Sequence, residues 1–315
     1  MTRSLFQRRP DLLPSLGIAF SSGLWGLFWI PVRAVKDAGI SAAWTGPSMF
    51  ACVVVALLPV AIYRWRKFLA SDAGFWSACG LAGITFTLYT ISFNLTDVVR
   101  AMLLFYVSPV WSTLLGLVFL GERLTLNRVL AIALGIGGLA VVLGAGDGFP
   151  WPRQMGDWFA LGSGLCWSIA SVRFFQGGAT LLIEKTFAFA VCALLASVVL
   201  AMLPLGIDAT VPGFTLLGSV WGWLVVVAVI VPPALYFVVW PTTVLSPARV
   251  GILFMFEAIV GVGSAAILTE EPFGMRETLG TLLILSAGIA EMIRPQSVGA
   301  EGSLEPSSAA YEESG

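Results

Sequence analysis

The chain has 315 residues, of which 58% are apolar and only 11% are charged, and its formal net charge is −1. Soluble domains average about 45–50% apolar and about 25% charged residues. So little charge cannot cover a water-facing surface, which excludes an ordinary soluble enzyme, a disordered protein and a nucleic-acid-binding protein with a basic stripe. The chain contains no histidine, which excludes histidine-based catalysis and histidine metal sites. We expect an integral membrane protein whose surroundings are the lipid bilayer, with no catalytic residues, no metal and no cofactor.

The apolar stretches are long and lack the alternation of barrel strands, so they predict transmembrane helices. A helix needs about 20 residues to cross a hydrocarbon core of about 30 Å. The predicted fold class is therefore all-α integral membrane, with ten transmembrane helices at 12–33, 43–63, 74–94, 99–120, 127–145, 157–176, 185–204, 215–240, 248–269 and 277–294.

Basic residues are divided unevenly between alternate loops. With the N-terminus inside, the outer loops hold only five of the 17 basic residues, namely Arg33, Lys36, Arg100, Arg153 and Arg276. Lys and Arg accumulate on the cytoplasmic side, so this division predicts a multi-pass protein of the plasma (inner) membrane with both termini in the cytoplasm. Residues 295–315 carry glutamates and no basic residue, and their Ser, Gly and Ala content predicts a disordered acidic tail.

The chain contains an internal repeat. Residues 100–105 (Arg-Ala-Met-Leu-Leu-Phe) match residues 249–254 (Arg-Val-Gly-Ile-Leu-Phe), and the same spacing pairs Glu122 with Glu271. Ser22-Gly23-Leu24 matches Ser163-Gly164-Leu165 in the first and sixth segments. Five helices is an odd number, so we predict two inverted five-helix repeats, residues 1–145 and 146–294. An inverted repeat with a site near the midplane is typical of secondary transporters.

Several short motifs resemble a known family. Each half has a tryptophan in its first helix, in Trp25-Gly26 and Trp167-Ser168, and the fourth segment reads Leu-Phe-Tyr-Val-Ser-Pro at 104–109 and ends in Gly-Glu-Arg-Leu-Thr. The ninth reads Phe-Glu-Ala at 256–258 and ends in Glu-Glu-Pro. Over residues 12–294 the chain resembles the drug/metabolite transporter superfamily, in its ten-helix form with two EamA-type repeats. The resemblance implies an exporter of amino acids or other small metabolites, with aromatic amino-acid exporters as candidate relatives.

Glu257 is the most informative single residue. It lies eight residues after Arg249, about 12 Å along a helix and close to the centre of the membrane. A charged carboxylate there costs at least about 2.5 kcal/mol, so it must be paired, protonated or in contact with a wet cavity. We interpret it as a carboxylate that binds protons or a substrate ammonium. The alternative is a structural carboxyl that is hydrogen-bonded to a neighbouring helix.

Other residues inside the predicted spans are candidates for the substrate site. Ser108 is the repeat partner of Glu257, and Pro109 after it predicts a kink, either in a gating helix that lines the cavity or as an inherited bend without ligand contact. Pro232 and Pro233 must break or kink the eighth span, either as a hinge or as a static bend. Aromatic rings suit an amphipathic substrate with an ammonium group, although core packing is the better explanation for any single one of them. The aromatic candidates are Trp25, Trp29, Tyr89, Tyr106, Trp167 and Phe254.

One glycine-rich motif, at residues 135–140, does not indicate the nucleotide binding that its pattern usually predicts. Residues 135–140 fit the dinucleotide pattern G-x-G-x-x-A, but they lie inside an apolar helix and not after a strand, so small residues that allow close helix packing are the better interpretation. The function predicted by these features is a secondary transporter working by alternating access through a midplane cavity. An integral-membrane enzyme or a channel is the alternative.

Overall fold

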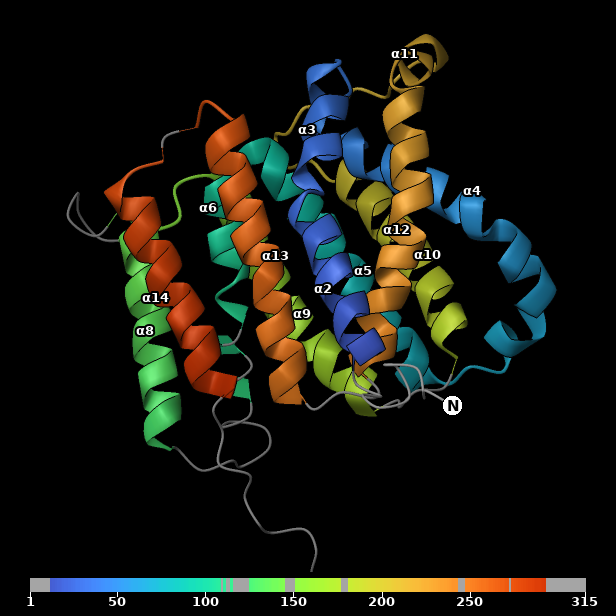
Figure 1. Ribbon diagram of the computed structural model, residues 1–315. Coiled ribbons are helices and arrows are strands. Elements are labelled where there is room, and N and C mark those ends of the chain that lie inside the picture. The colour runs from blue at the N-terminus through green and yellow to red at the C-terminus, as the bar shows by residue number, and fades with distance from the viewer. Residues whose placement is uncertain are drawn as a thin grey trace, which may run out of the picture.

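The computed structural model describes residues 12–108, 110–111, 114–115, 125–144, 151–176, 181–242, 247–271 and 273–292 (Figure 1). Over these residues it consists of helices and their connections, without a strand, which confirms the all-α prediction. The helices are α2 (Leu12–Gly26), α3 (Trp29–Asp37), α4 (Ala42–Leu69), α5 (Ala73–Leu95), α6 (Val98–Phe105), α8 (Leu126–Leu143), α9 (Met155–Gln176), α10 (Leu182–Met202), α11 (Phe214–Ser219), α12 (Trp221–Thr242), α13 (Pro247–Leu268) and α14 (Met275–Met292).

Within the described part of the chain, five helical segments are long and apolar enough to cross a membrane. They are Leu12–Asp37, Ala42–Phe68, Ala73–Leu95, Leu182–Met202 and Trp221–Pro241. Shorter apolar helices cover Val129–Leu143 and Leu253–Leu268. A helix is present at each of the ten predicted positions, while the count of ten crossings stays a prediction. Helix α2 begins and α14 ends on the same side of the bundle (Figure 1). The acidic tail at 295–315 lies outside the described residues.

The first predicted span is present within the segment Leu12–Asp37, but a turn interrupts its helix. Helix α2 ends at Gly26, and α3 begins at Trp29 after a turn. Pro31 explains the break, because it has no N–H to donate to the carbonyl of Leu27. The amide of Ile30 donates to that carbonyl instead, at 3.1 Å, in a tighter turn. The break leaves irregular backbone in the middle of the segment Leu12–Asp37.

The other proline-based predictions have different outcomes. Helix α6 ends at Phe105, followed by a turn at Tyr106 and Val107, whereas Pro109 itself lies outside the described residues. Of the break or kink predicted at Pro232 and Pro233, a break does not occur, because α12 runs without interruption through both, and the kink stays a prediction. The eighth predicted span instead divides earlier, between α11 and α12.

Helices α8 and α14 pack side by side at one edge of the bundle (Figure 1). A side chain at Gly138 would meet Leu283 Cβ at 3.0 Å and the carbonyl of Gly280 at 3.2 Å. Gly280 in turn lies against Val142 of α8. The interpretation of residues 135–140 as a close-packing motif is therefore confirmed. In the rest of the bundle, α5 packs against α9 and α10, and α2 packs against α12 and α13.

Candidate functional site

Glu257 lies in the middle of α13, on the helix face that also carries Gly261 and Ser264. This face packs against α2 and α3. A side chain at Gly26 would come within 2.7 Å of the Glu257 carbonyl oxygen, so only glycine permits the two backbones to approach this closely. One turn further along, the indole nitrogen of Trp29 donates a hydrogen bond to Ser264 Oγ at 3.0 Å. Two of the predicted residues, Trp29 and Glu257, therefore lie on one packed interface.

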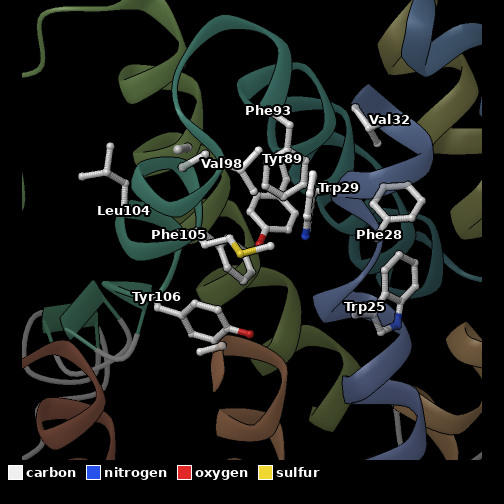
Figure 2. Close-up of a cluster of buried hydrophobic side chains, with 14 of the residues drawn as sticks. Trp25, Phe28, Trp29, Val32, Tyr89, Phe93, Val98, Leu104, Phe105 and Tyr106 are labelled. Atoms are coloured by element: carbon white, nitrogen blue, oxygen red, sulfur yellow. The ribbon is translucent and has the colours of Figure 1, made fainter. Parts of the chain in front are cut away.

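Two tyrosines approach the same carboxyl group. The Tyr106 hydroxyl interacts with the Glu257 side chain, and Tyr89 is close enough to interact with it electrostatically. Tyr106 lies in the turn that ends α6, and Tyr89 lies in α5, where it packs on Phe105 with ring centroids 4.5 Å apart. In Figure 2 the hydroxyls of both tyrosines and the indole nitrogen of Trp29 point toward the space between the three rings. Four elements thus bring their polar side-chain ends to one region.

Several buried side-chain polar atoms in this part of the bundle lack hydrogen-bond partners. Tyr89 Oη and Tyr106 Oη are both buried, and neither makes a hydrogen bond of full geometry within the described part of the chain. The same holds for Ser22 Oγ and Trp25 Nε1 on α2, which no described contact joins to Glu257. Buried polar side chains in proteins nearly always have such a partner. Each unmet group costs about 1–3 kcal/mol, so a cluster of them indicates a place where a ligand or water completes the bonding.

An aromatic path leads from this cluster into the second half of the chain. Trp25 packs on Phe86 with centroids 4.7 Å apart, and Phe86 packs on Phe189 at 5.0 Å and on Trp167 at 6.1 Å. Phe86, Trp167 and Phe189 also line a small pocket whose wall includes the buried Lys185. The predicted residue Trp167 therefore lies beside the cluster and is joined to it through Phe86.

The remaining candidates lie elsewhere or make different contacts. Phe254 packs against Ile18 of α2 and also against the large buried cluster that contains Trp29 and Tyr89. Ser108 contributes its backbone carbonyl, which accepts a hydrogen bond from Ser168 Oγ at 2.8 Å. Pro232 and Pro233 lie within α12, and no described contact links them to Glu257. Pro109 lies outside the described residues. The sequence did not single out Phe28, Phe86 or Phe105, because an aromatic residue in an apolar helix has no local signature of a site.

A polar network lies at the end of the bundle where α3 and α13 end. Glu271 Oε1 accepts from Arg33 Nη2 at 2.8 Å, and Glu271 Oε2 accepts from the amide of Val98 at 2.6 Å. Arg33 Nη2 also donates to the carbonyl of Thr96 at 2.9 Å. Burial raises the pKa of Glu271, an effect that the Arg33 guanidinium opposes. Glu271 therefore has both an arginine and a backbone partner, whereas its repeat partner Glu122 lies outside the described residues.

A second ion pair lies nearby and was not foreseen. Arg100 donates through Nε and Nη2 to the two carboxylate oxygens of Asp157, at 2.8 Å and 2.9 Å. Arg100 Nη1 donates to the carbonyl of Val142, and Thr96 Oγ1 donates to Asp157 Oδ1. These bonds join α6, α8, α9 and the connection after α5. Sequence alone gave no signal for this pairing, because the partners come from different predicted spans.

An apolar helical bundle with a carboxyl group beside buried tyrosine hydroxyls is typical of an integral membrane protein with a polar interior site. Residues 13–144 match the EamA-like transporter family. Protein RarD of Streptomyces exfoliatus is 30% identical over 151 residues, which make up 46% of this chain and 46% of that protein. The match thus spans about half the length of that curated relative. These matches confirm the predicted resemblance: residues 13–144, in the first half of the chain, are similar to the EamA-like transporters of the drug/metabolite transporter superfamily.

The fold is also similar to that of a solved protein structure. A crystal structure matches with a TM-score of 0.56 at 17% sequence identity, over 88% of this chain and 95% of that chain. The structural match extends well beyond the residues covered by the family match, so the similarity in fold includes helices of the second half.

Proposed function

We propose that this protein is a secondary transporter, not an enzyme, that exports amino acids or similar small amphipathic metabolites across the plasma membrane. The proposal extends the EamA-type match, which gives a membrane transporter, to a substrate class and a mechanism. In it, Glu257 and the surrounding aromatic residues form the substrate site, and the site is exposed alternately to the two sides of the membrane. Both termini lie in the cytoplasm, as the distribution of basic residues predicts.

The observation that supports this proposal best is the environment of Glu257. Its carboxyl group lies in an apolar helix with the hydroxyl of Tyr106 beside it and the indole of Trp29 on the same face of α13. Burying a carboxylate inside a membrane protein costs free energy, so such residues are rare and usually have a functional role. Aromatic rings attract ammonium groups by cation–π contact, and a carboxylate attracts them by charge. A substrate ammonium, or a proton that takes its place on the return step, fits this environment.

The packing also agrees with two inverted repeats. The repeat pairs Gly26 with Ser168 and Glu257 with Ser108. In the first pair of helices, Gly26 lies against the Glu257 carbonyl, and in the second, Ser168 lies against the Ser108 carbonyl. The same helix-to-helix contact therefore recurs at corresponding positions. Related halves that exchange their packing are the usual basis of alternating access, and we propose that mechanism here.

Transport by purified protein in liposomes tests the proposal. Liposomes loaded with an unlabelled L-amino acid should accumulate the labelled one by counterflow, with a rate that saturates. Glu257→Gln should reduce this rate at least tenfold while the protein still elutes as a single folded species. Glu270→Gln is the matched control, because Glu270 is exposed just after the end of α13 and should transport normally. Wild-type counterflow and wild-type pH dependence in the Glu257→Gln variant would contradict the assigned role.

Flux measurements separate this function from the alternatives that the sequence left open. A channel conducts without saturation and shows no counterflow, and an enzyme changes its solute chemically. Saturable counterflow of an unmodified solute is expected only of a transporter.

A further inference from the structure

We propose that the site recognises a primary ammonium group through three hydrogen-bond acceptors, Glu257, Tyr89 and Tyr106, and that it discriminates against N-methylated substrates. This inference rests on the proposed function and specifies its substrate class. A primary ammonium has three N–H donors and no acceptor. The three side chains supply the matching acceptors, one carboxylate and two phenolic oxygens.

The positions of the three groups support this assignment. The Tyr106 hydroxyl lies beside the Glu257 carboxyl, and Tyr89 interacts electrostatically with both of them. Each phenolic oxygen is buried and lacks a hydrogen bond of full geometry to any described group. A phenolic hydroxyl can donate one hydrogen bond and still has lone pairs with which to accept from a ligand. An ammonium group placed between the three would therefore complete the bonding that the protein leaves unmet.

The walls of the site fit the same cation. Tyr89 packs on Phe93 and Phe105, each with ring centroids 4.5 Å apart, and Phe105 packs on Tyr106 at 5.3 Å. Rings around a cation contribute to binding of any ammonium, whether methylated or not. Only the hydrogen bonds to the three acceptors depend on N–H groups. The aromatic walls thus account for affinity, and the three acceptors account for the distinction between primary and quaternary ammonium.

The distinction follows from donor geometry. A trimethylammonium group has the same charge but no N–H, so it leaves both phenolic oxygens unpaired in a water-poor region. A site built to hydrogen-bond a substrate N–H rejects the analogue that lacks it, because its own polar groups remain unmet. We expect at least a tenfold lower kcat/KM for the trimethylated compound, since each hydrogen bond to a charged group contributes a factor of about ten or more.

The experiment compares matched pairs of zwitterions in counterflow by the full-length protein. The probes are L-phenylalanine, L-tryptophan and L-leucine, each beside its N,N,N-trimethyl derivative. Tyr89→Phe and Tyr106→Phe should each lower kcat/KM about tenfold for the unmethylated compounds and leave the trimethylated ones within twofold. Tyr63→Phe is the matched control, because Tyr63 is 88% exposed and should affect neither set.

The outcomes distinguish the two proposals. Equal transport of both members of each pair, or an equal loss on both in the tyrosine variants, would overturn the ammonium assignment and leave the transporter function standing. Transport of none of the six compounds would overturn the proposed amino-acid export itself. A loss confined to the unmethylated compounds would support both, and it cannot arise from misfolding, because misfolding lowers transport of every compound.

Discussion

The close approach of α2 and α13 at Gly26 leads to the sharpest structural prediction. In Gly26→Ala the new Cβ would lie 2.7 Å from the Glu257 carbonyl oxygen, 2.9 Å from the Gly261 nitrogen and 3.0 Å from Val260 Cβ. Ordinary van der Waals contact begins at 3.4 Å. Two of the three atoms belong to the backbone of α13, so they cannot rotate away as a flexible side chain could. The helices must separate or tilt to admit the methyl group.

Overpacking and helix propensity together determine how much Gly26→Ala changes the free energy of unfolding. Overpacking a tightly packed site costs about 1–3 kcal/mol. Replacing glycine by alanine in a helix recovers up to about 1 kcal/mol of helix propensity. The expected net loss in the free energy of unfolding is therefore about 1–2 kcal/mol. Because the shift displaces the Glu257 backbone, transport should fall as well, even at temperatures where the protein remains folded.

Gly263→Ala is the matched control, since Gly263 lies on α13 and a Cβ there would meet nothing within 4 Å. Its free energy of unfolding should stay unchanged or rise by up to about 1 kcal/mol, by helix propensity alone. Unfolding in detergent micelles and counterflow in liposomes measure the two effects. If Gly26→Ala matched Gly263→Ala in both measurements, the backbone contact between α2 and α13 would not exist as described.

Three further predictions concern the polar network. A double-mutant cycle with Arg33→Ala and Glu271→Ala should give a coupling energy of about 0.5–3 kcal/mol in unfolding experiments, whereas additive losses would show that the pair is not formed. Arg100→Lys should cost about 1–3 kcal/mol, because one ammonium cannot reproduce the two-pronged contact with Asp157; an unchanged unfolding curve would refute the geometry. Burial raises the pKa of Glu271 above its ordinary value of 4.5, so the folded protein binds that proton more readily than the unfolded chain. Its contribution to stability is therefore present below about pH 4.5 and lost as the pH rises through the raised pKa, and Glu271→Gln should flatten the pH dependence of unfolding in that window.

Hydropathy predicted the positions of the helices well, because an apolar run of membrane length has few other stable conformations. It did not predict the interruption between α2 and α3, although the cause was visible. Pro31 lies four residues after Leu27, and a proline leaves the carbonyl four positions earlier without its donor. The same rule applied to Pro232 and Pro233 predicted a break or a kink, and α12 is continuous through both residues. A proline therefore identifies the unmet carbonyl, and tertiary packing decides whether the helix ends there.

The candidate site was partly predictable for a similar reason. Glu257 was identified because a carboxylate in the middle of an apolar helix is rare and expensive, and that cost is a local property. The partnership of Tyr106 with Glu257 depends on how α6 and α13 meet, which no local pattern encodes. The ion pair of Arg100 with Asp157 is likewise a product of tertiary structure. Sequence identified the chemistry of single residues, and only the fold identified the partners.

The two proposed repeats differ at the positions that correspond to Glu257 and Gly26. The proposed repeat places Ser108 where the second half has Glu257, and Ser168 where the first half has Gly26. In one half a glycine lets two backbones touch, and the partner position carries a carboxylate. In the other half a serine hydroxyl bonds the partner's carbonyl at 2.8 Å, and the partner position carries only a hydroxyl. A purely structural duplication has no reason to place a charge at one of two equivalent positions inside a membrane, where it costs at least about 2.5 kcal/mol. The carboxyl group at one of the two positions, beside the buried hydroxyl of Tyr106, therefore supports the proposed substrate site.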